Sequence, residues 1–197
     1  MYILGASGHA KVIIDILSLD GDKLMVYDDR HDIKEILGVP VHSPLPQASS
    51  EKLGEGIIAI GDNKIRNRLA QKYLSNFDFI NIIHSSAILS NYCSIGKGNV
   101  IMERAIVKAD ALIGDHVIVN TGSIVEHDCV LGDFVHIAPG AVLCGHVEVG
   151  EGTLIGAGST VLPSVKIGNW SIIAAGSVVH KNVPDFGVWI SDSLVVK

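Results

Sequence analysis

Every sixth residue between Ile83 and Val179 is aliphatic, without an exception. The row comprises Ile83, Leu89, Ile95, Ile101, Val107, Ile113, Val119, Val125, Leu131, Ile137, Leu143, Val149, Ile155, Val161, Ile167, Ile173 and Val179. A period of six is neither the 3.6 of a helix nor the 2 of a strand. A short fixed repeat indicates a solenoid, in which each unit buries its apolar face against its neighbours. We therefore predict a triangular coil of short strands and corners.

Two further patterns support this coil. The residues two places before the aliphatic ones are mostly small, as a narrow interior requires: Cys93, Ala105, Ala111, Ser123, Cys129, Ala141, Ser159, Ser171 and Ser177. Glycines follow the aliphatic residue at intervals of eighteen, at Gly96, Gly114, Gly132, Gly150 and Gly168. Three six-residue units therefore make one turn, and we expect these glycines at corners, where a positive φ is inexpensive only without a Cβ.

The first eighty residues do not follow this six-residue repeat. The pattern predicts strands at 1–4, 24–27, 56–60 and 79–82, helices at 11–19 and 64–74, and an irregular segment from Pro40 to Glu55. Strands that alternate with helices indicate a parallel α/β sheet, whose ligands bind beyond the carboxyl ends of the strands. The turn at Gly5–His9, the pair Asp28-Asp29 and the loop Gly61–Asn63 all follow such ends, so we expect them to converge.

The glycine turn at Gly5 and Gly8 is only half of a dinucleotide-binding fingerprint, because the full G-x-G-x-x-G is absent. One interpretation is structural, with the glycines allowing a helix and a strand to pack closely. A nicotinamide reductase is disfavoured, since the domain has no room for a second βαβ half. We prefer a site for part of a nucleotide, with a phosphate at the helix start and Asp28 or Asp29 accepting hydrogen bonds from a base.

Composition excludes several classes of protein. A formal net charge of −6 argues against a nucleic-acid binder. No run of about twenty apolar residues exists, so we expect no membrane-spanning helix, and the first residues do not read as a signal peptide. Cys93, Cys129 and Cys144 have no C-x-x-C spacing and are interpreted as small buried thiols in a reducing cytoplasm.

The repeat resembles that of the hexapeptide-repeat acyltransferases. Gly5-Ala6-Ser7-Gly8-His9, the later Asp28-Asp29 and the segment 60–66 (IGDNKIR), all ahead of such a repeat, resemble the sialic-acid O-acetyltransferase (NeuD-type) family in particular. Its best understood members are N-acetyltransferases of nucleotide-linked 4-amino-4,6-dideoxy sugars. The resemblance implies a Rossmann-like α/β domain at 1–82, a left-handed parallel β-helix at 83–181, a C-terminal tail at 182–197, and a cytoplasmic enzyme of surface glycan biosynthesis.

The resemblance also implies the ligands and their sites. It implies a homotrimer with acetyl-CoA in the groove between subunits, no metal, no nucleic acid and no membrane insertion. The nucleotide part of the sugar would be held by the residues that match the family motif: Gly8, His9, Asp28, Asp29, Gly61 and Asn63, with Arg66 as a weaker candidate. His136 corresponds to a family histidine near the cofactor or substrate, and we predict a binding contact there.

Acetyl transfer to an amine requires a base, a group that holds the oxyanion, and aligned reactants. His127 stands between Glu126 and Asp128, and a carboxylate bonded to one ring nitrogen leaves the other free as a base. We predict His127 as general base and Asp128 as the residue that orients it, the alternative being a surface histidine among solvated acids. Gly145 follows His127 by eighteen residues, so its amide would lie beside the histidine and bind the thioester oxygen. His116 and His146 are interpreted as exposed corner residues.

The same stacking predicts a track for the coenzyme. Asn120, Ala138, Gly156 and Ala174 form one column, with Pro139, Ala157 and Ala175 beside it. Successive small residues would leave a smooth groove for the pantetheine arm, with Gly156, Ala157 and Ala175 as contacts. The alternative interpretation is that corners simply favour small residues. Lys166, His180 and Lys181 are weaker candidates for binding the coenzyme's phosphates.

The tail after Pro184 departs from the family pattern, and Trp189 either stacks on the adenine or packs on the last coil.

The predicted activity is therefore acetyl transfer from acetyl-CoA to a nucleotide-linked amino sugar. O-acetylation of sialic acid or of a polysaccharide precursor would use a similar base. A zinc hydratase like the γ-type carbonic anhydrases needs three histidines with a close H-x₄-H pair, which the spacing of His127, His136 and His146 does not provide. A catalytically silent scaffold is disfavoured by the pair His127-Asp128. The sequence identifies neither the nucleotide base nor the sugar stereochemistry.

Overall fold

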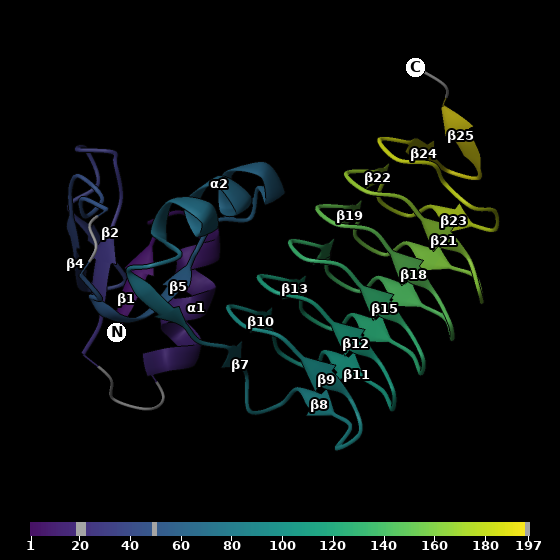
Figure 1. The fold of residues 1–197 in the computed structure, drawn as a ribbon, viewed down its shortest axis with the longest axis horizontal. Helices are drawn as coiled ribbons and strands as arrows, with labels where there is room; N and C mark the ends of the chain where they lie inside the picture. Colours follow the sequence, from purple (N-terminus) through teal and green to yellow (C-terminus); the bar gives the residue numbers. More distant parts are fainter. Residues whose placement is uncertain (19–22, 49–50, 196–197) are drawn as a thin grey trace. The chain divides into compact units, whose positions relative to one another are not determined.

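The computed structural model describes residues 1–18, 23–48 and 51–195, and it consists of two compact units, Met1–Ile82 and Ile83–Lys197 (Figure 1). Each unit is described by itself below. None of the helices in the described ranges has the length and apolar character needed to cross a membrane.

The first unit is built on a mainly parallel sheet with the strand order β3-β4-β2-β1-β5-β6. The strands are β1 (Tyr2–Leu4), β2 (Met25–Tyr27), β3 (Glu35–Ile36), β4 (Val39–His42), β5 (Gly54–Ile58) and β6 (Phe77–Phe79), and the helices are α1 (Gly8–Ser18) and α2 (Asn63–Tyr73). Ile3, Leu4 and Ile57 are fully buried beneath the helices' apolar residues, such as Ile13. The predicted α/β order is present; α1 begins three residues before the predicted start, and Leu19 lies outside the described residues.

The segment Pro40–Glu55, predicted as irregular, is partly strand. Pro40 lies in β4, and β5 already begins at Gly54. β3 and β4 form an antiparallel hairpin whose two turn residues, Leu37 and Gly38, have φ of 48° and 78°. Two positive φ angles match the twist of a tight hairpin, but leucine is an unusual residue for the first position. Only Gly38, one of the two turn positions, therefore has the residue type from which such a hairpin can be predicted.

The second unit is a coil whose strands form three sheets, in which all strands except β25 run parallel. One sheet continues through β7 (Ile82–Ile83), β10 (Val100–Ile101), β13 (Ile118–Val119), β16 (His136–Ile137), β19 (Leu154–Ile155), β22 (Ile172–Ile173), β24 (Val188–Ile190) and β25 (Ser193–Val195). The second contains β8 (Ile88–Leu89), β11 (Ile106–Val107), β14 (Ile124–Val125), β17 (Val142–Leu143), β20 (Thr160–Val161) and β23 (Val178–Val179). The third contains β9 (Ser94–Ile95), β12 (Leu112–Ile113), β15 (Val130–Leu131), β18 (Glu148–Val149) and β21 (Lys166–Ile167).

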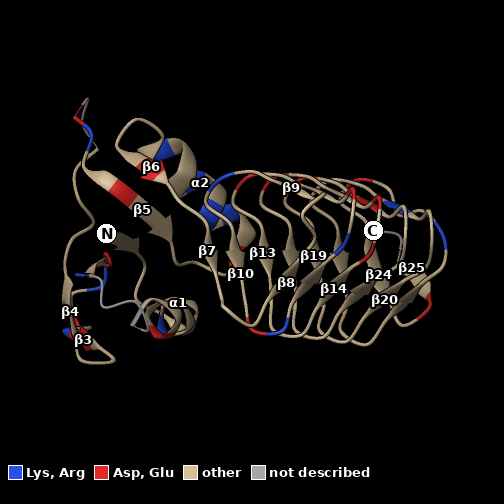
Figure 2. Cartoon of the chain, turned by 90° about the horizontal axis from the view of Figure 1, so that it is seen from below, with Lys and Arg blue, Asp and Glu red and all other residues tan. Residues whose placement is uncertain are grey.

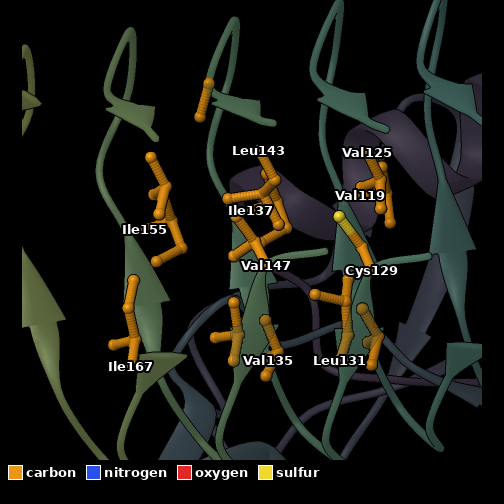
Figure 3. Packing of buried hydrophobic residues seen from close by; sticks show 14 of the residues in the cluster. Val119, Val125, Cys129, Leu131, Val135, Ile137, Leu143, Val147, Ile155 and Ile167 are labelled. Atoms are coloured by element: carbon orange, nitrogen blue, oxygen red, sulfur yellow. The ribbon is translucent and has the colours of Figure 1, made fainter. Parts of the chain in front are cut away.

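The register between neighbouring coils is eighteen residues. Ile118 pairs with His136, and Ile124 pairs with Val142, which confirms that three six-residue units make one turn. The aliphatic row fills the interior, and each of its members from Ile101 to Val179 is at most 5% exposed (Figure 3). Ile83, the first member, is 42% exposed, so burial does not extend to the start of the row.

The corners differ from the prediction. Every sixth residue from Gly98 to Gly176 has a positive φ, between 52° and 70°, and this row includes Asp128 and His146. The glycines at 96, 114, 132, 150 and 168 do not belong to it. They lie instead where successive coils approach most closely: a Cβ on Gly132 would stand 2.8 Å from the backbone nitrogen of Glu151. Their glycine identity follows from lack of space rather than from φ.

The segment after residue 181 extends the coil. β24 pairs in parallel with β22, and β25 returns antiparallel against β24. Trp189 is 2% exposed, and its Nε1 donates a hydrogen bond to the carbonyl of Val178. Of the two interpretations of Trp189, packing on the last coil is the one that the structure shows. Residues 196–197 of the predicted tail lie outside the described residues.

The close approach at Gly132 makes a testable prediction. Gly132→Ala should lower stability by about 3 kcal/mol, because backbone rather than a flexible side chain blocks the new methyl group. Gly122→Ala is the matched control: Gly122 has a φ of 65° but open space around it, so the cost should be about 1 kcal/mol. Thermal unfolding followed by circular dichroism measures both, and a larger loss for Gly122→Ala would contradict this account.

Candidate active site

Three strand ends meet at one edge of the first sheet, as predicted. The strands β1, β2 and β5 are parallel neighbours, so their carboxyl ends lie together. The N–H of Gly5 donates to the carbonyl of Tyr27 at 2.7 Å, and the N–H of Ala6 donates to Oδ2 of Asp28 at 2.7 Å. Gly5 has a φ of 112°, and a Cβ there would stand 3.0 Å from the carbonyl oxygen of Ala59. The glycine turn, Asp28 and the end of β5 therefore lie together at one edge of the sheet.

Asp28 is buried and bonded within the chain. Besides Ala6, it accepts hydrogen bonds from the backbone N–H of Arg30 at 2.9 Å and from its Nε at 3.0 Å. Burial raises the pKa of the Asp28 carboxyl, but these hydrogen bonds outweigh burial and the pKa is lowered. An ionised carboxylate so engaged fixes the glycine turn. Arg30, which the sequence analysis missed, also donates to the carbonyl of Ala6 and keeps about half of its side chain exposed beside the turn.

The other predicted residues of this edge remain more accessible. Asp29 is exposed, and its Oδ1 accepts the N–H of Leu45 at 3.1 Å. Gly8 is exposed at the start of α1, and His9 is half-buried next to it. These positions bring backbone N–H groups of a helix start and a carboxylate to the same crevice edge.

Arg66, the weaker candidate for contact with the nucleotide, is buried. It is 1% exposed, and its guanidinium donates to the carbonyls of Ile60 and Gly61 and to Oδ1 of Asn63. Burial lowers the pKa of Arg66 to about 10, with Asp62 acting in the opposite direction. The arginine thus holds the loop Gly61–Asn63 in place from beneath. Its helical position gave no sign of burial, because the burying partners come from the loop before it.

In the second unit, His127 and Asp128 lie at a corner that follows β14. Nδ1 of His127 lies 2.6 Å from Oδ2 of Asp128, so the predicted hydrogen bond is present. Asp128 has a φ of 60°, and its N–H donates to the carbonyl of Ala109 one coil earlier. The two side chains are 55% and 41% exposed. With Nδ1–H donated to the carboxylate, Nε2 of His127 is the free basic nitrogen, and it has no hydrogen-bond partner among the described residues.

Gly145 lies against the ring of His127, as the eighteen-residue register predicts. A Cβ on Gly145 would stand 2.6 Å from Cε1 and 2.7 Å from Nε2 of His127, so only glycine leaves room for the imidazole. The neighbouring N–H groups of Cys144 and His146 donate to the carbonyls of Val161 and His127. The N–H of Gly145 has no acceptor in the described parts of the chain. A free amide donor therefore lies next to a free basic nitrogen.

His146 joins this group, which the sequence analysis did not foresee. Its Nε2 lies 3.6 Å from Oδ2 of Asp128, and its ring is perpendicular to that of His127 with centroids 5.4 Å apart. It is exposed as expected, but it is not an isolated corner residue. The signal was available: 128 plus eighteen is 146, so the register that predicted Gly145 also places His146 above Asp128.

The side chains of His127, Asp128 and His146 also carry nitrogen and oxygen atoms that all lie within 4.8 Å of one another. Such atoms can hold a cation, but Nδ1 of His127 is already bonded to Asp128. The group therefore combines a hydrogen-bonded ring nitrogen with a second one, Nε2 of His127, that has no partner among the described residues.

His116 is buried, which corrects its interpretation as an exposed corner residue. It is 5% exposed and stacks on Phe134, with ring centroids 5.3 Å apart and planes 3° from parallel. Both residues belong to the positive-φ row, one coil apart. Whether a corner residue is exposed or buried depends on the side chain that stacks on it from the next coil. The six-residue repeat does not specify that side chain.

The coenzyme track lies at a different corner. Gly156 is buried while Ala157 and Ala175 are exposed, in a column whose positive-φ glycines at 158 and 176 also have open space around them. His136, in β16, has its Nε2 3.2 Å from Nδ2 of Asn120. This corner follows the sheet of β16, whereas the corner of His127 follows the sheet of β14. The sheet of β14 and β17 thus separates the two corners, and one chain alone does not bring them together.

The three weaker candidates for binding the coenzyme's phosphates differ in whether their side chains already have a partner. Lys166 forms an ion pair with Glu148 at 2.8 Å, and His180 packs edge-on against Trp189. Lys181 is exposed and has no partner in the described ranges. A groove of about 810 Å³ runs along the sheet of β15, β18 and β21, but its lining contains Lys166 and none of the predicted catalytic residues.

The cysteines near His127 are poorly suited to act as nucleophiles. Cys129 is fully buried, and its Sγ donates to the carbonyl of Cys144 at 3.2 Å. Burial raises the pKa of the Cys129 thiol to about 11. All three cysteines are free thiols. A thiol with such a pKa is protonated at physiological pH and cannot attack a thioester efficiently.

Two family models match the chain. The PglD N-terminal domain matches residues 1–73, and the bacterial transferase hexapeptide family, with six repeats, matches residues 110–145 and 146–181. A curated relative, the UDP-N-acetylbacillosamine N-acetyltransferase of Bacillus subtilis, is 42% identical over 108 residues. That match spans 51% of this chain and about half the length of the relative.

Solved structures match over the whole chain. Perosamine N-acetyltransferase from Caulobacter crescentus, in complex with CoA and GDP-perosamine, is 36% identical with a TM-score of 0.89, covering 100% of this chain and 95% of that one. The acetyltransferase domain of PglB from Neisseria gonorrhoeae, in complex with acetyl coenzyme A, is 31% identical with a TM-score of 0.90, covering 100% and 98%.

The fold and the matches together define the class: an α/β unit followed by a left-handed β-helix of hexapeptide repeats, the architecture of these acetyltransferases. The fold class predicted from the sequence is thereby confirmed. The chain belongs to the PglD-type family of hexapeptide-repeat sugar N-acetyltransferases.

The raised pKa of Cys129 predicts low reactivity. At pH 8 only about one Cys129 in a thousand would be a thiolate, so iodoacetamide should leave it unmodified in the folded protein. Cys144, which is partly exposed, serves as the internal comparison, and peptide mass spectrometry reads both sites. Reactivity should appear as pH rises toward 11 or on unfolding; rapid alkylation of Cys129 at pH 8 would contradict the assignment.

Proposed function

We propose that this protein transfers the acetyl group of acetyl-CoA to the amino group of a nucleotide-linked 4-amino-4,6-dideoxy sugar. One observation carries the proposal: Nε2 of His127 and the N–H of Gly145 are adjacent, and neither has a partner in the described part of the chain. A base and an amide donor are what amine attack on a thioester requires. The Bacillus subtilis relative is by name a UDP-N-acetylbacillosamine N-acetyltransferase, and the perosamine N-acetyltransferase of Caulobacter crescentus is in complex with GDP-perosamine, which supports an amine acceptor.

The chemistry runs by direct attack. The amine nitrogen forms a bond to the thioester carbon while Nε2 of His127 takes one amine proton, and Nδ1–H remains bonded to Asp128. The carboxylate stabilises the imidazolium so formed. The N–H of Gly145 donates to the oxyanion of the tetrahedral intermediate. The C–S bond then breaks, and CoA leaves as a thiolate that receives the proton from His127.

The first unit provides the acceptor site in this proposal. The N–H groups at the start of α1, at Gly8 and His9, hold a phosphate of the nucleotide. Asp29 and the loop Gly61–Asn63 face the same crevice edge and contact the base or ribose. Asp28 acts mainly by holding the glycine turn and Arg30, whose exposed guanidinium adds a positive charge for the diphosphate.

We further propose a homotrimer, with the coenzyme between subunits. The outward residues of the sheet of β14 and β17 are uncharged and mostly aliphatic: Ile88, Ile106, Ile124, Val142, Thr160 and Val178. Figure 2 shows that the charges of the coil lie mainly at its corners. An apolar face of this kind indicates a protein contact. The corner of His127 borders one edge of the face and the small-residue track the other.

A second copy, packed on this face by a threefold operation, would bring its own track to the His127 of the first copy. The pantetheine arm would lie along Gly156, Ala157 and Ala175, with His136 as a further contact and Lys181 near the phosphates. Each of the three resulting sites combines two chains. This arrangement accounts for the separation of base and track within one chain.

The free thiols support a cytoplasmic location in our proposal, since disulfides are not part of the fold. A nucleotide-linked product supports a role in surface glycan synthesis.

O-acetylation, the alternative activity, would use the same base, and the relatives' names favour an amine as the acceptor. The zinc hydratase is set aside, because the two solved structures named above, which match the whole chain, are acetyltransferases.

An assay with acetyl-CoA and a panel of UDP-, dTDP- and GDP-linked 4-amino sugars, following release of free thiol, tests the activity. Within it, His127→Ala should lower kcat by about 10²–10⁴-fold and leave both KM values within a few-fold, because the base acts only in the transition state. Asp128→Asn should lower kcat by a smaller factor. Lys97→Ala, which changes an exposed side chain at a corner after β9, is the control.

Release of thiol without any acceptor in the panel being acetylated would overturn the proposed activity. A near wild-type rate for His127→Ala would overturn the mechanism. An acetylated cysteine trapped by mass spectrometry would do the same, since direct attack forms no acetyl-enzyme.

The trimer is tested by a charge on the apolar face. Val142→Asp should yield monomers of 20.9 kDa by light scattering and abolish activity, because a carboxylate cannot be buried there without a partner. Leu112→Asp is the matched control, since Leu112 is an outward residue on the sheet of β12 and β15 and is 49% exposed. An active monomer, or a Val142→Asp variant that still forms trimers, would contradict the arrangement.

A further inference from the structure

We propose that Lys108 binds the phosphate group on the anomeric oxygen of the acceptor sugar. The inference rests on the proposed function and deepens it, because it assigns a residue of the second unit to the recognition of the acceptor. Two observations carry it. Lys108 lies at the corner one coil before His127, and its ammonium has no ion-pair partner among the described residues.

Backbone hydrogen bonds fix the position of this corner. The N–H of Lys108 donates to the carbonyl of Val125 at 2.9 Å. The N–H of Asp128 donates to the carbonyl of Ala109 at 3.1 Å, so the two corners lie directly beside each other on successive coils. Strands of neighbouring coils are about 5 Å apart. Lys108 is therefore within reach of a sugar-sized ligand whose amine lies at His127.

The order of the coils decides on which side of His127 the acceptor lies. In the proposed site the thioester oxygen lies at the N–H of Gly145, one coil after His127, and the coenzyme track continues through Gly156 to Ala175 on later coils. A threefold axis parallel to the coil keeps this order in the second copy, which supplies the track. The coenzyme thus occupies the side of the later coils. The acceptor is left with the side of the earlier coils, where Ala109 is half-buried and has no side chain beyond Cβ.

The chemistry of the acceptor sets the place of its phosphate. In a nucleotide-linked 4-amino pyranose, the amine on C4 and the phosphate on the anomeric oxygen are at opposite ends of the ring. With the amine at Nε2 of His127 and the ring over Ala109, the phosphate lies further along the earlier coils. The flexible four-carbon side chain of Lys108 can place its ammonium there.

The charges of the two corners explain why a cation is needed at this place. Glu126, Asp128 and Asp110 are acidic, and carboxylates repel a diphosphate. Lys108 is exposed, and it is the one lysine or arginine in the two corners. A lysine ammonium binds a phosphate as a point charge. Lys108 therefore offsets the repulsion that the acceptor would otherwise meet beside the base.

A second lysine of the coil shows that the ammonium of Lys108 is free by position and not by lack of acidic neighbours. Lys166 forms an ion pair at 2.8 Å with Glu148, which precedes it by eighteen residues. Glu126 follows Lys108 by the same eighteen residues, but within residues 51–195 these two side chains form no ion pair. The charge of Lys166 is thus neutralised within the chain, whereas that of Lys108 is open to an anionic ligand.

The test is the steady-state kinetics of the full-length protein. Lys108→Ala should raise KM for the nucleotide sugar about ten-fold, because it removes one charge-assisted contact to a phosphate. The same variant should leave kcat and KM for acetyl-CoA unchanged, since neither the base nor the coenzyme track is touched. Lys108→Arg, which keeps the positive charge, should restore most of the affinity for the nucleotide sugar.

Inhibition by free nucleotides gives a second measurement. For whichever of UDP, dTDP and GDP matches the accepted sugar, Lys108→Ala should raise the inhibition constant of the diphosphate about ten-fold. The inhibition constant of the matching monophosphate should not change, because it lacks the second phosphate. Lys97→Ala, which removes another exposed lysine from a corner of the coil, is the matched control and should leave all of these constants at their wild-type values.

The outcomes separate the inference from the function on which it rests. An unchanged KM for the nucleotide sugar in Lys108→Ala, or a rise in KM for acetyl-CoA instead, overturns the inference while acetylation by the wild type leaves the proposed function intact. An equal loss of monophosphate and diphosphate inhibition also overturns it. If the wild type acetylates no acceptor of the panel, the proposed function fails and the inference fails with it.

Discussion

The hydrogen-bonded register of eighteen residues between successive coils is the constraint on which the second unit depends. Each residue lies beside the one eighteen places away, so the interior repeats and the neighbours of every side chain are set by position. The same register places Gly145 against the ring of His127 and His146 against Asp128. A substitution in one coil is therefore felt first by the residue eighteen places before or after it.

The candidate catalytic residues lie at the corners, where the coil exposes its backbone and polar side chains. The strands bury aliphatic residues, whereas the corners expose backbone and polar side chains, and the free N–H of Gly145 lies at such a corner. The positive φ at each corner turns the chain sharply and directs the side chains of Asp128 and His146 outward. In the first unit, buried ion and hydrogen-bond networks around Asp28 and Arg66 hold the crevice loops. In both units, rigid scaffolding positions groups that are otherwise exposed.

The sequence analysis predicted the hydrogen bond between His127 and Asp128 and the position of Gly145 beside the His127 ring, because both follow from residue type and register. It missed His146, although the same arithmetic applies, since it treated histidines outside the motif as solvated. It also judged His116 exposed, whereas His116 is buried, and it gave no indication that Arg66 is buried. Burial at a corner or on a helix depends on what packs above it. The hairpin at Leu37 escaped notice because its turn lacks the expected residue at one position.

The sequence by itself determined the two-part organisation, the period of the coil, its aliphatic interior and the adjacency of His127 and Gly145. These are consequences of repetition, in which one spacing dictates every contact. Only the tertiary structure decided that the glycines at 96 and 132 serve close approach rather than positive φ, that Trp189 closes the coil, and that the base and the small-residue track border opposite edges of one apolar face. Those features depend on distances between coils and on the direction of each corner, which no single spacing specifies.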